Sequence, residues 1–204
     1  MVQTKKPAIN DAILAAAAGL FREKGYAGVS MSEIARAASV SPANIYVYFP
    51  SKLDLLLAVY EPWLRDQIEQ MCETAYTIND ARERVRYVLR DVWRDLPSRE
   101  NGFARSLVQA LSASSTEDVC SRDLFIWAEQ RVEEVLLDAM PEARRAMLQD
   151  GVLARLIFVA FDGFVMKHHA SGPCERVDQV VDAMSVLVAG SDGAAGEAAA
   201  ALNA

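Results

Sequence analysis

A short stretch near the N-terminus, SVSPANIYVYFPSK over residues 39–52, gathers side chains that can bind phosphate. Hydroxyl and amide groups dominate it, and its one formal charge is the lysine at its end. Hydroxyls, helix N-termini and single lysines are common phosphate ligands, while an asparagine can bind either a phosphate or an adenine edge. We therefore expect a nucleic-acid contact surface made of Ser30, Ser41, Pro42, Ala43, Asn44, Tyr46, Val47, Tyr48 and Lys52.

Two short helices joined by a turn are expected to hold these residues. Ser30 is a candidate N-cap with Glu33 as its capping-box partner, and Ser41 is a second N-cap followed by Pro42 at the first helical position. The spacing is that of a helix-turn-helix, with the small Ala35 where the two helices cross. The second helix then protrudes as a rod that a DNA major groove can admit.

The segment ahead of this pair predicts a supporting helix. Residues 8–24 carry one apolar stripe and end at Gly25, in the usual position for a left-handed glycine cap. Phe21 in this helix and Ile45 in the protruding one are expected to pack together. Lys5 and Lys6 precede the helix and are candidates for an arm over the DNA backbone or minor groove.

Composition predicts a folded protein with an uneven charge. The 204 residues are 52% apolar and 24% charged, which is typical of a packed core. The net charge of −7 argues against a nucleic-acid partner at first sight. Residues 1–60, however, hold six Lys or Arg against four Asp or Glu, and the remainder holds fifteen against twenty-four. A modestly basic N-terminal piece therefore precedes an acidic remainder.

Several classes of protein are not expected. No apolar run approaches the roughly 18–20 residues that cross a bilayer, so no membrane partner is expected. Cys72, Cys120 and Cys174 are far apart and lack a CxxC spacing, which argues against a disulfide scaffold and is typical of a reducing cytoplasm. There is no Walker loop, GxGxxG, HExxH or GxSxG, so we expect no catalysis, no cofactor and no metal site.

The whole chain reads as an all-α fold of about nine helices. Ser51 can cap a long fourth helix, and Pro62 predicts a kink within it. Further helices are predicted at about residues 80–96, 101–113, 121–139, 143–170 and 175–189. The small, low-complexity tail 191–204 is expected to be disordered.

Residues 9–60 resemble the DNA-binding domain of the TetR family of bacterial transcriptional regulators. The resemblance lies in ILAAAAGLFREKGYAGVSMSEIARAASVSPANIYVYFPSKLDLL, with its G-Y pair, I-A-x-x-A core and I-Y-x-Y-F-x-S-K ending. Three positions depart from the family. Ser39 replaces the usual turn glycine and is expected to be left-handed at a cost of roughly 1 kcal/mol. Val29 stands where threonine or serine is common, and Ala43 where glycine is frequent.

The resemblance implies a helix-turn-helix DNA-binding domain over residues 1–50 and a helical ligand-binding and dimerisation domain over 51–190. It implies a homodimer that binds a near-palindromic double-stranded DNA operator. In the usual behaviour of the family, a small-molecule effector releases a repressor from that operator. Activation or co-repression stays open, and a helical adaptor that binds only proteins is the rival interpretation.

Two sets of residues in the second domain are candidates for these roles. The apolar helices 152–166 and 175–189 are expected to pair with their symmetry mates, although 152–166 is alternatively the core helix of one protomer. The expected interface residues are Leu156, Phe161, Asp162, Gly163, Val177, Val181 and Met184. Aromatic residues that are candidates for the pocket of an apolar or aromatic effector, or else ordinary core, are Trp63, Tyr87, Trp93, Phe103 and Trp127.

Overall fold

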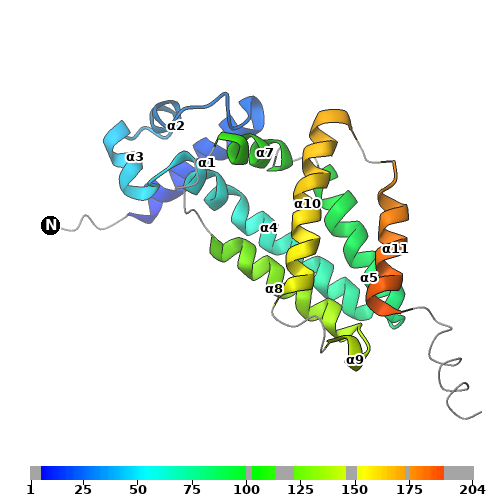
Figure 1. The fold of residues 1–204 in the computed structure, drawn as a ribbon. Helices are drawn as coiled ribbons and strands as arrows, with labels where there is room; N and C mark the ends of the chain where they lie inside the picture. Colours follow the sequence, from blue (N-terminus) through cyan, green and yellow to red (C-terminus); the bar gives the residue numbers. More distant parts are fainter. Residues whose placement is uncertain (1–5, 100–102, 114–121, 146–150, 173–174, 191–204) are drawn as a thin grey trace, which may run out of the picture. The chain divides into compact units, whose positions relative to one another are not determined.

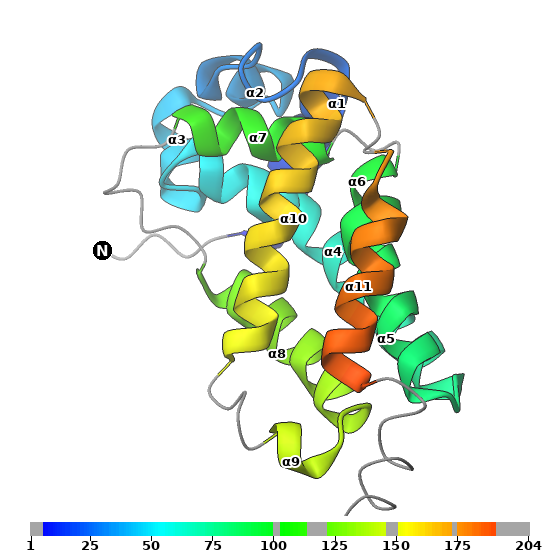
Figure 2. The same ribbon diagram turned by 45° about the vertical axis from the view of Figure 1, so that its right-hand side comes forward.

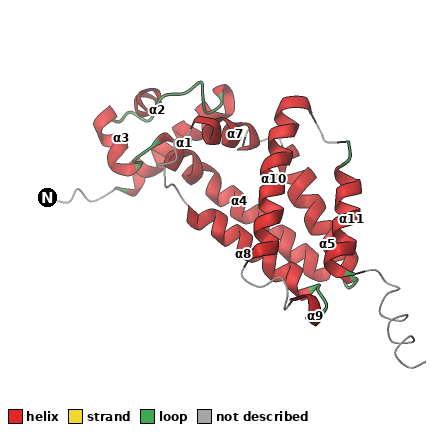
Figure 3. Cartoon of the chain, viewed as in Figure 1, coloured by secondary structure: helices red, strands yellow, loops and turns green. Residues whose placement is uncertain are grey.

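All regular elements that the structure describes are helices. It is a computed structural model, and it describes residues 6–99, 103–113, 122–145, 151–172 and 175–190. Within these ranges no strand occurs, which confirms the all-α expectation (Figure 3). The predicted disordered tail, 191–204, lies outside the described residues. The chain divides into two compact units, one of residues 1–66 with 99–125 and the other of residues 67–98 with 126–204.

The first unit contains the helices that carry the predicted contact surface (Figure 1). They are α1 (Pro7–Lys24), α2 (Met31–Ala37), α3 (Pro42–Tyr48), the first part of α4 (Lys52–Thr77) and α7 (Phe103–Ala113). Helix α2 packs against both α1 and α3. The side chains of Phe21, Ile34, Ala35 and Ile45 are fully buried, as expected for residues between these helices, whereas Leu20 and Val40, which were expected there too, are half-buried.

Side-chain N-caps begin α2 and α3, and residues with positive φ follow α1 and α2. The hydroxyl oxygen of Ser30 accepts a hydrogen bond from the backbone N–H of Glu33 at 3.2 Å, and that of Ser41 accepts one from Asn44 at 3.1 Å. Gly25 ends α1 with a φ of 70°, and Ser39 in the turn between α2 and α3 has a φ of 56°. Ser39 thus has the positive φ that the left-handed expectation requires, whereas Gly25 combines its positive φ with a ψ of 173° and so is not the left-handed cap expected at that position.

Glu33 takes part in the predicted capping box of α2, where the backbone N–H of Ser30 donates a hydrogen bond to its carboxylate, and it also reaches another helix. The Glu33 carboxylate pairs with the ammonium of Lys24 on α1 at 2.5 Å. That hydrogen bond holds the pKa of Glu33 below its usual range and raises the pKa of Lys24. The ion pair joins the end of α1 to the first turn of α2, so Glu33 contributes to the spacing of two helices as well as to the start of one.

Helix α4 begins with a complete capping box. The Ser51 hydroxyl accepts from the backbone N–H of Asp54, and the Asp54 carboxylate accepts from the backbone N–H of Ser51, each at 3.0 Å. Ser51 therefore caps α4 as expected. The helix continues through Pro62, starting in the first unit and ending in the second. The kink at Pro62 stays a prediction.

The second unit holds the remaining helices, and Figure 2 brings the last two forward. It contains α5 (Ala81–Arg90), a π-helical turn η1 (Asp91–Asp95), α6 (Leu96–Ser98), most of α8 (Arg122–Asp138), α9 (Glu142–Arg145), α10 (Val152–Ser171) and α11 (Val177–Ala189). The single helix predicted over 143–170 is wrong, because α9 ends at Arg145 and α10 begins after Gly151, whose φ is 75°. Among the described helices none is long and apolar enough to cross a bilayer.

Arginines four residues apart line the seam between α5 and α11, which pack together. Arg86 pairs with Asp182 at 2.8 Å, and Arg90 and Arg94 pair with Asp178 at 3.2 and 3.0 Å. The aspartates are half exposed, so each pair adds little to the free energy of folding. These ion pairs show that the face of α11 carrying Asp178 and Asp182 lies towards α5.

Candidate nucleic-acid interface

Helix α3 has one buried and one exposed face. Ile45 and Tyr48 lie three residues apart and point inward, whereas Tyr46 and Val47 are 52% and 38% exposed. Pro42, Ala43 and Ser41 are exposed as well, and Asn44 lies half-buried at the border. Within the first unit, the outer face therefore presents most of the residues expected to contact DNA.

Tyr48 does not present its phenol on that face, contrary to expectation. Its side chain is 6% exposed, and its hydroxyl accepts a 2.9 Å hydrogen bond from the backbone N–H of Lys6. The reason is the helical period, which puts residue 48 above Ile45 on the inner face. Tyr48 thus joins the end of α3 to the residue just ahead of α1.

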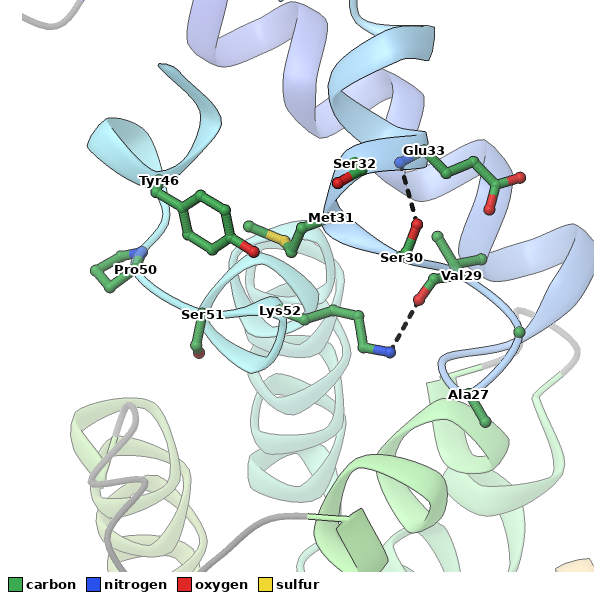
Figure 4. Close-up of a pocket in the computed structure, with 11 residues that line it drawn as sticks. Ala27, Val29, Ser30, Met31, Ser32, Glu33, Tyr46, Pro50, Ser51 and Lys52 are labelled. Carbon is green, nitrogen blue, oxygen red and sulfur yellow. Dashed lines mark hydrogen bonds between the residues drawn. The ribbon is translucent and has the colours of Figure 1, made fainter. Parts of the chain in front are cut away.

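A polar hollow of about 790 Å³ opens beside α3 (Figure 4). Tyr46 enters it from α3, Ser30 and Ser32 enter it from the start of α2, and Lys52 enters it from the start of α4 (Figure 4). The full lining is Ala27, Gly28, Val29, Ser30, Met31, Ser32, Glu33, Tyr46, Pro50, Ser51 and Lys52. Hydroxyl groups and one ammonium are therefore collected around a space that an anion can enter.

Lys52 binds the protein's own backbone in this hollow. Its ammonium donates to the carbonyl oxygens of Tyr26 and Val29, each at 2.9 Å, and lies 4.1 Å from the centroid of the Tyr26 ring. Burial lowers its pKa from the ordinary lysine value. Since an ammonium has three N–H donors, two are used by the loop before α2 and one remains for another acceptor. The sequence predicts Lys52 as a phosphate ligand and does not predict its hydrogen bonds to the backbone.

Sequence reasoning missed two hydroxyl-bearing residues that line the hollow. Ser32 is exposed in the first turn of α2, and Ser51 lines the hollow while capping α4. A signal for Ser32 was present, because it lies two residues after the predicted N-cap Ser30, where a side chain stands near the start of the helix. The loop residues Ala27 and Gly28 carried no such signal.

The expected dimer contacts fall on both faces of α10 and α11. Leu156 is 58% exposed, and Asp162 and Gly163 are also exposed, but Phe161 is 4% exposed. On α11, Val177 and Val181 are buried and Met184 is half-buried. Phe161, Val177 and Val181 are therefore corrected to core residues of the protomer. The exposed apolar residues of the two helices are instead Val152, Leu156, Val159, Met166, Val180 and Leu187, named here the apolar stripe.

The four aromatic pocket candidates whose side chains the structure describes do not line the hollow beside α3. Trp93 is buried, donates its indole N–H to the carbonyl oxygen of Ile157 at 2.9 Å, and packs against Phe164. The other described candidates, Trp63, Tyr87 and Trp127, are half-buried, and the side chain of Phe103 lies outside the described residues. Trp93 thus has the core role that the sequence left open as an alternative.

The cysteine expectations can be followed at one position. Cys72 is free and fully buried, and burial raises the pKa of its thiol to about 11. A thiol of this kind is protonated and unreactive at neutral pH. Cys120 and Cys174 lie outside the described residues. No cluster of potential metal ligands occurs among the residues described.

Two short capped helices, the second of them exposed as a rod, and a supporting helix define a helix-turn-helix protein. Residues 13–59 match the family described as "Bacterial regulatory proteins, tetR family". The N-terminal part of the chain is therefore similar to the DNA-binding domain of the TetR family.

Similar proteins extend this assignment in part. The HTH-type transcriptional regulator CymR of Pseudomonas putida is 48% identical over 58 residues, which cover 28% of this chain and 28% of CymR. The HTH-type transcriptional regulator BetI of Rhizobium meliloti is 33% identical over 135 residues, covering 65% of this chain and 64% of BetI. These relatives are named as transcriptional regulators and not as enzymes, in agreement with the missing catalytic motifs.

A solved structure shows that the fold is shared beyond the N-terminal domain. The transcriptional regulator FadR from Bacillus subtilis, in complex with stearoyl-CoA, superimposes with a TM-score of 0.58. The match covers 89% of this chain and 98% of FadR at 22% identity. Since the match with CymR spans about a quarter of either protein, the similarity in fold carries no residue roles into the remainder of this chain.

Proposed function

We propose that this chain is a transcriptional regulator that reads DNA with the outer face of α3. The exposed face of α3 is the observation that carries the proposal. Pro42, Ala43, Tyr46 and Val47 are exposed, while Ile45 is buried on the opposite face of the helix. A short rod held this way can enter a major groove, and small and apolar side chains then meet base edges and thymine methyls.

The hollow beside α3 supports the proposal because it suits a phosphate of the same DNA. Ser30, Ser32 and Tyr46 bring hydroxyl donors to it, and Lys52 adds a positive charge. Glu33 also lines the hollow, but its carboxylate is already paired with Lys24, which reduces repulsion of an anion. Contacts to phosphate orient a protein on DNA, and base contacts then supply the specificity.

A second copy of the chain is the proposed partner of the apolar stripe. Val152, Leu156 and Val159 recur at helical spacing on α10, and Val180 and Leu187 do so on α11. Soluble proteins rarely expose a contiguous apolar face of this kind without a partner. Two-fold pairing of both helices makes a four-helix interface and presents two α3 helices to a near-palindromic operator.

The proposed effector is a small apolar or aromatic molecule bound by the second unit, and the proposed default state is a repressor. Helix α4 contributes residues to both units, so it is the element that an effector can bias. A coupling free energy of about 1–3 kcal/mol is typical of such regulation. The stearoyl-CoA of FadR belongs to a protein 22% identical to this one and selects no effector here.

Gel retardation with the DNA upstream of the chain's own gene tests the proposal. A regulator retards that DNA in preference to a shuffled duplex, and the logarithm of its affinity falls linearly with the logarithm of the salt concentration. A helical adaptor that binds only proteins retards neither duplex. Equal retardation of both duplexes would reduce the proposal to non-specific DNA binding.

A further inference from the structure

The loop between α1 and α2 is held by side chains from outside the helix-turn-helix. Lys52 of α4 binds the carbonyl oxygens of Tyr26 and Val29, as described above. The backbone N–H of Ala27, between them, donates a 3.0 Å hydrogen bond to the side-chain oxygen Oε1 of Gln109. Ala27 and Val29 both line the hollow. The loop 26–29 forms one wall of the hollow. Lys52 hydrogen-bonds two of its backbone carbonyl oxygens, and Gln109 accepts from one of its backbone N–H groups.

Gln109 also lies against the end of α1. Its Oε1 would be 2.9 Å from a Cβ on Gly25, so a larger residue there would require the amide group of Gln109 to move. One turn earlier on α7, the guanidinium of Arg105 donates to the carbonyl oxygen of Arg22 at 3.3 Å. Two side chains of α7 therefore contact the last turn of α1 and the loop that follows it.

The hydrogen bond from Ala27 to Gln109 is exposed, which indicates what it contributes. An exposed N–H that loses its partner binds water instead, so the bond adds little to the free energy of folding. A water molecule in place of Gln109 would satisfy the Ala27 N–H but would not hold the loop in one position. Since α7 lies beyond the matched residues 13–59, this contact comes from a part of the chain that the helix-turn-helix motif does not include.

We propose that Gln109 is a positioning residue for DNA binding, which holds residues 26–29 so that the hollow receives a DNA phosphate. The inference rests on the proposed function and adds to it a residue of α7. Gln109 acts through the loop and touches no base. Losing it removes one well-oriented phosphate contact per protomer and leaves the outer face of α3 unchanged.

Full-length Gln109→Met tests the inference, because methionine keeps the length of the side chain and removes the acceptor. The probe is the duplex that the wild-type protein enriches from a randomised pool, and fluorescence anisotropy measures its Kd across a salt series. We expect Kd to rise about fivefold, the effect of one ordinary hydrogen bond. We expect the log–log salt slope to lose about 0.9 per protomer, the value of one phosphate on duplex DNA.

Two further variants separate positioning from stability. Gln130→Met, at an exposed position of α8, is the matched control and should leave both Kd and slope unchanged. Gln109→Glu keeps an oxygen acceptor and should restore most of the affinity, most clearly at high salt, where the added charge is screened. It also stands in for Gln109→Met if that variant does not fold, since a Glu variant that binds like wild type is then the expected result.

The inference is overturned if Gln109→Met binds like wild type, if it weakens binding without changing the salt slope, or if Gln109→Glu is as weak as Gln109→Met. These outcomes can be distinguished from failure of the proposed function. If the proposed function is wrong, the wild-type protein itself enriches no sequence from the pool.

Discussion

The ammonium of Lys52 binds Tyr26 twice, through a 2.9 Å hydrogen bond to its carbonyl oxygen and through contact with its ring at 4.1 Å from the centroid. A second 2.9 Å hydrogen bond reaches the carbonyl oxygen of Val29. The start of α4 is thereby tied to the loop that leads into α2. One lysine that the sequence marks as a phosphate ligand is also a structural link between two parts of the proposed DNA surface.

Replacing Lys52 with methionine should therefore lower stability as well as DNA affinity. The variant keeps the length of the side chain and removes a charged donor from two carbonyl oxygens. We expect the free energy of unfolding to fall by about 1–3 kcal/mol in urea denaturation. Arg36→Met, at an exposed position of α2, is the control and should stay within about 0.5 kcal/mol of wild type. An unchanged urea midpoint in Lys52→Met would contradict the structural role.

The two tyrosines of α3 should respond differently to loss of their hydroxyl groups. Tyr46→Phe removes an exposed hydroxyl from the hollow, so DNA affinity should fall about two- to fivefold with no change in stability. Tyr48→Phe removes the acceptor of the Lys6 N–H, so stability should fall by about 0.5–1.5 kcal/mol. Paired anisotropy and urea measurements check both, and an exchange of the two effects would show that the faces of α3 are assigned wrongly.

A charge in the apolar stripe should separate the two protomers. Leu156→Glu places a carboxylate at a 58% exposed position of α10 and should convert a dimer to a folded monomer in sedimentation equilibrium. Phe161→Ala removes a buried ring, so it should cost about 3–5 kcal/mol of stability within each protomer. Gln130→Glu, on α8 and outside the stripe, is the charge control. A Leu156→Glu variant that remains dimeric would refute the proposed interface.

Cys72 predicts a loss of stability at alkaline pH. Its thiol has a pKa of about 11 in the fold against an ordinary value of 9.0, so folding favours the protonated form. This contribution is complete below pH 9 and is lost as the pH rises towards 11, because the unfolded thiol ionises first. A shift of two units corresponds to about 2–3 kcal/mol.

The measurement is urea denaturation of wild type and Cys72→Ala between pH 8 and the alkaline limit of folding. Cys72→Ala also leaves a small cavity, so it should be the less stable of the two at pH 8. The difference between the variants should then shrink as the pH rises. Parallel curves would show that Cys72 does not titrate with the fold.

Local chemistry explains which features could be predicted from sequence. Ser30, Ser41 and Ser51 cap their helices because the groups they bond lie three residues away. The positive φ of Gly25 and Ser39 follows from the same short-range logic. Tyr48 was assigned wrongly because both tyrosines of α3 satisfy the same motif, although the helical period from Ile45, which was expected to face inward, puts Tyr48 on the inner face.

Long-range contacts explain what was missed. Lys52 finds its acceptors 26 and 23 residues earlier in the chain, and Gln109 meets Ala27 across 82 residues. No local sequence pattern predicts hydrogen bonds between residues so far apart in the chain. Helix α10 poses a different difficulty, because it is apolar nearly all round. Its composition therefore does not distinguish the buried Phe161 from the exposed Leu156.

Selection of DNA from a randomised pool by the full-length protein tests the central claim most directly, when it is done in parallel with Val47→Ser. Val47 lies on the outer face of α3, is 38% exposed and is not one of the buried core residues. We predict that the wild-type protein enriches two inverted half-sites, and that Val47→Ser changes the preferred base at one position of each half-site and keeps the rest. The account is contradicted if the wild type enriches no motif, or if Val47→Ser enriches the same motif with the same affinity.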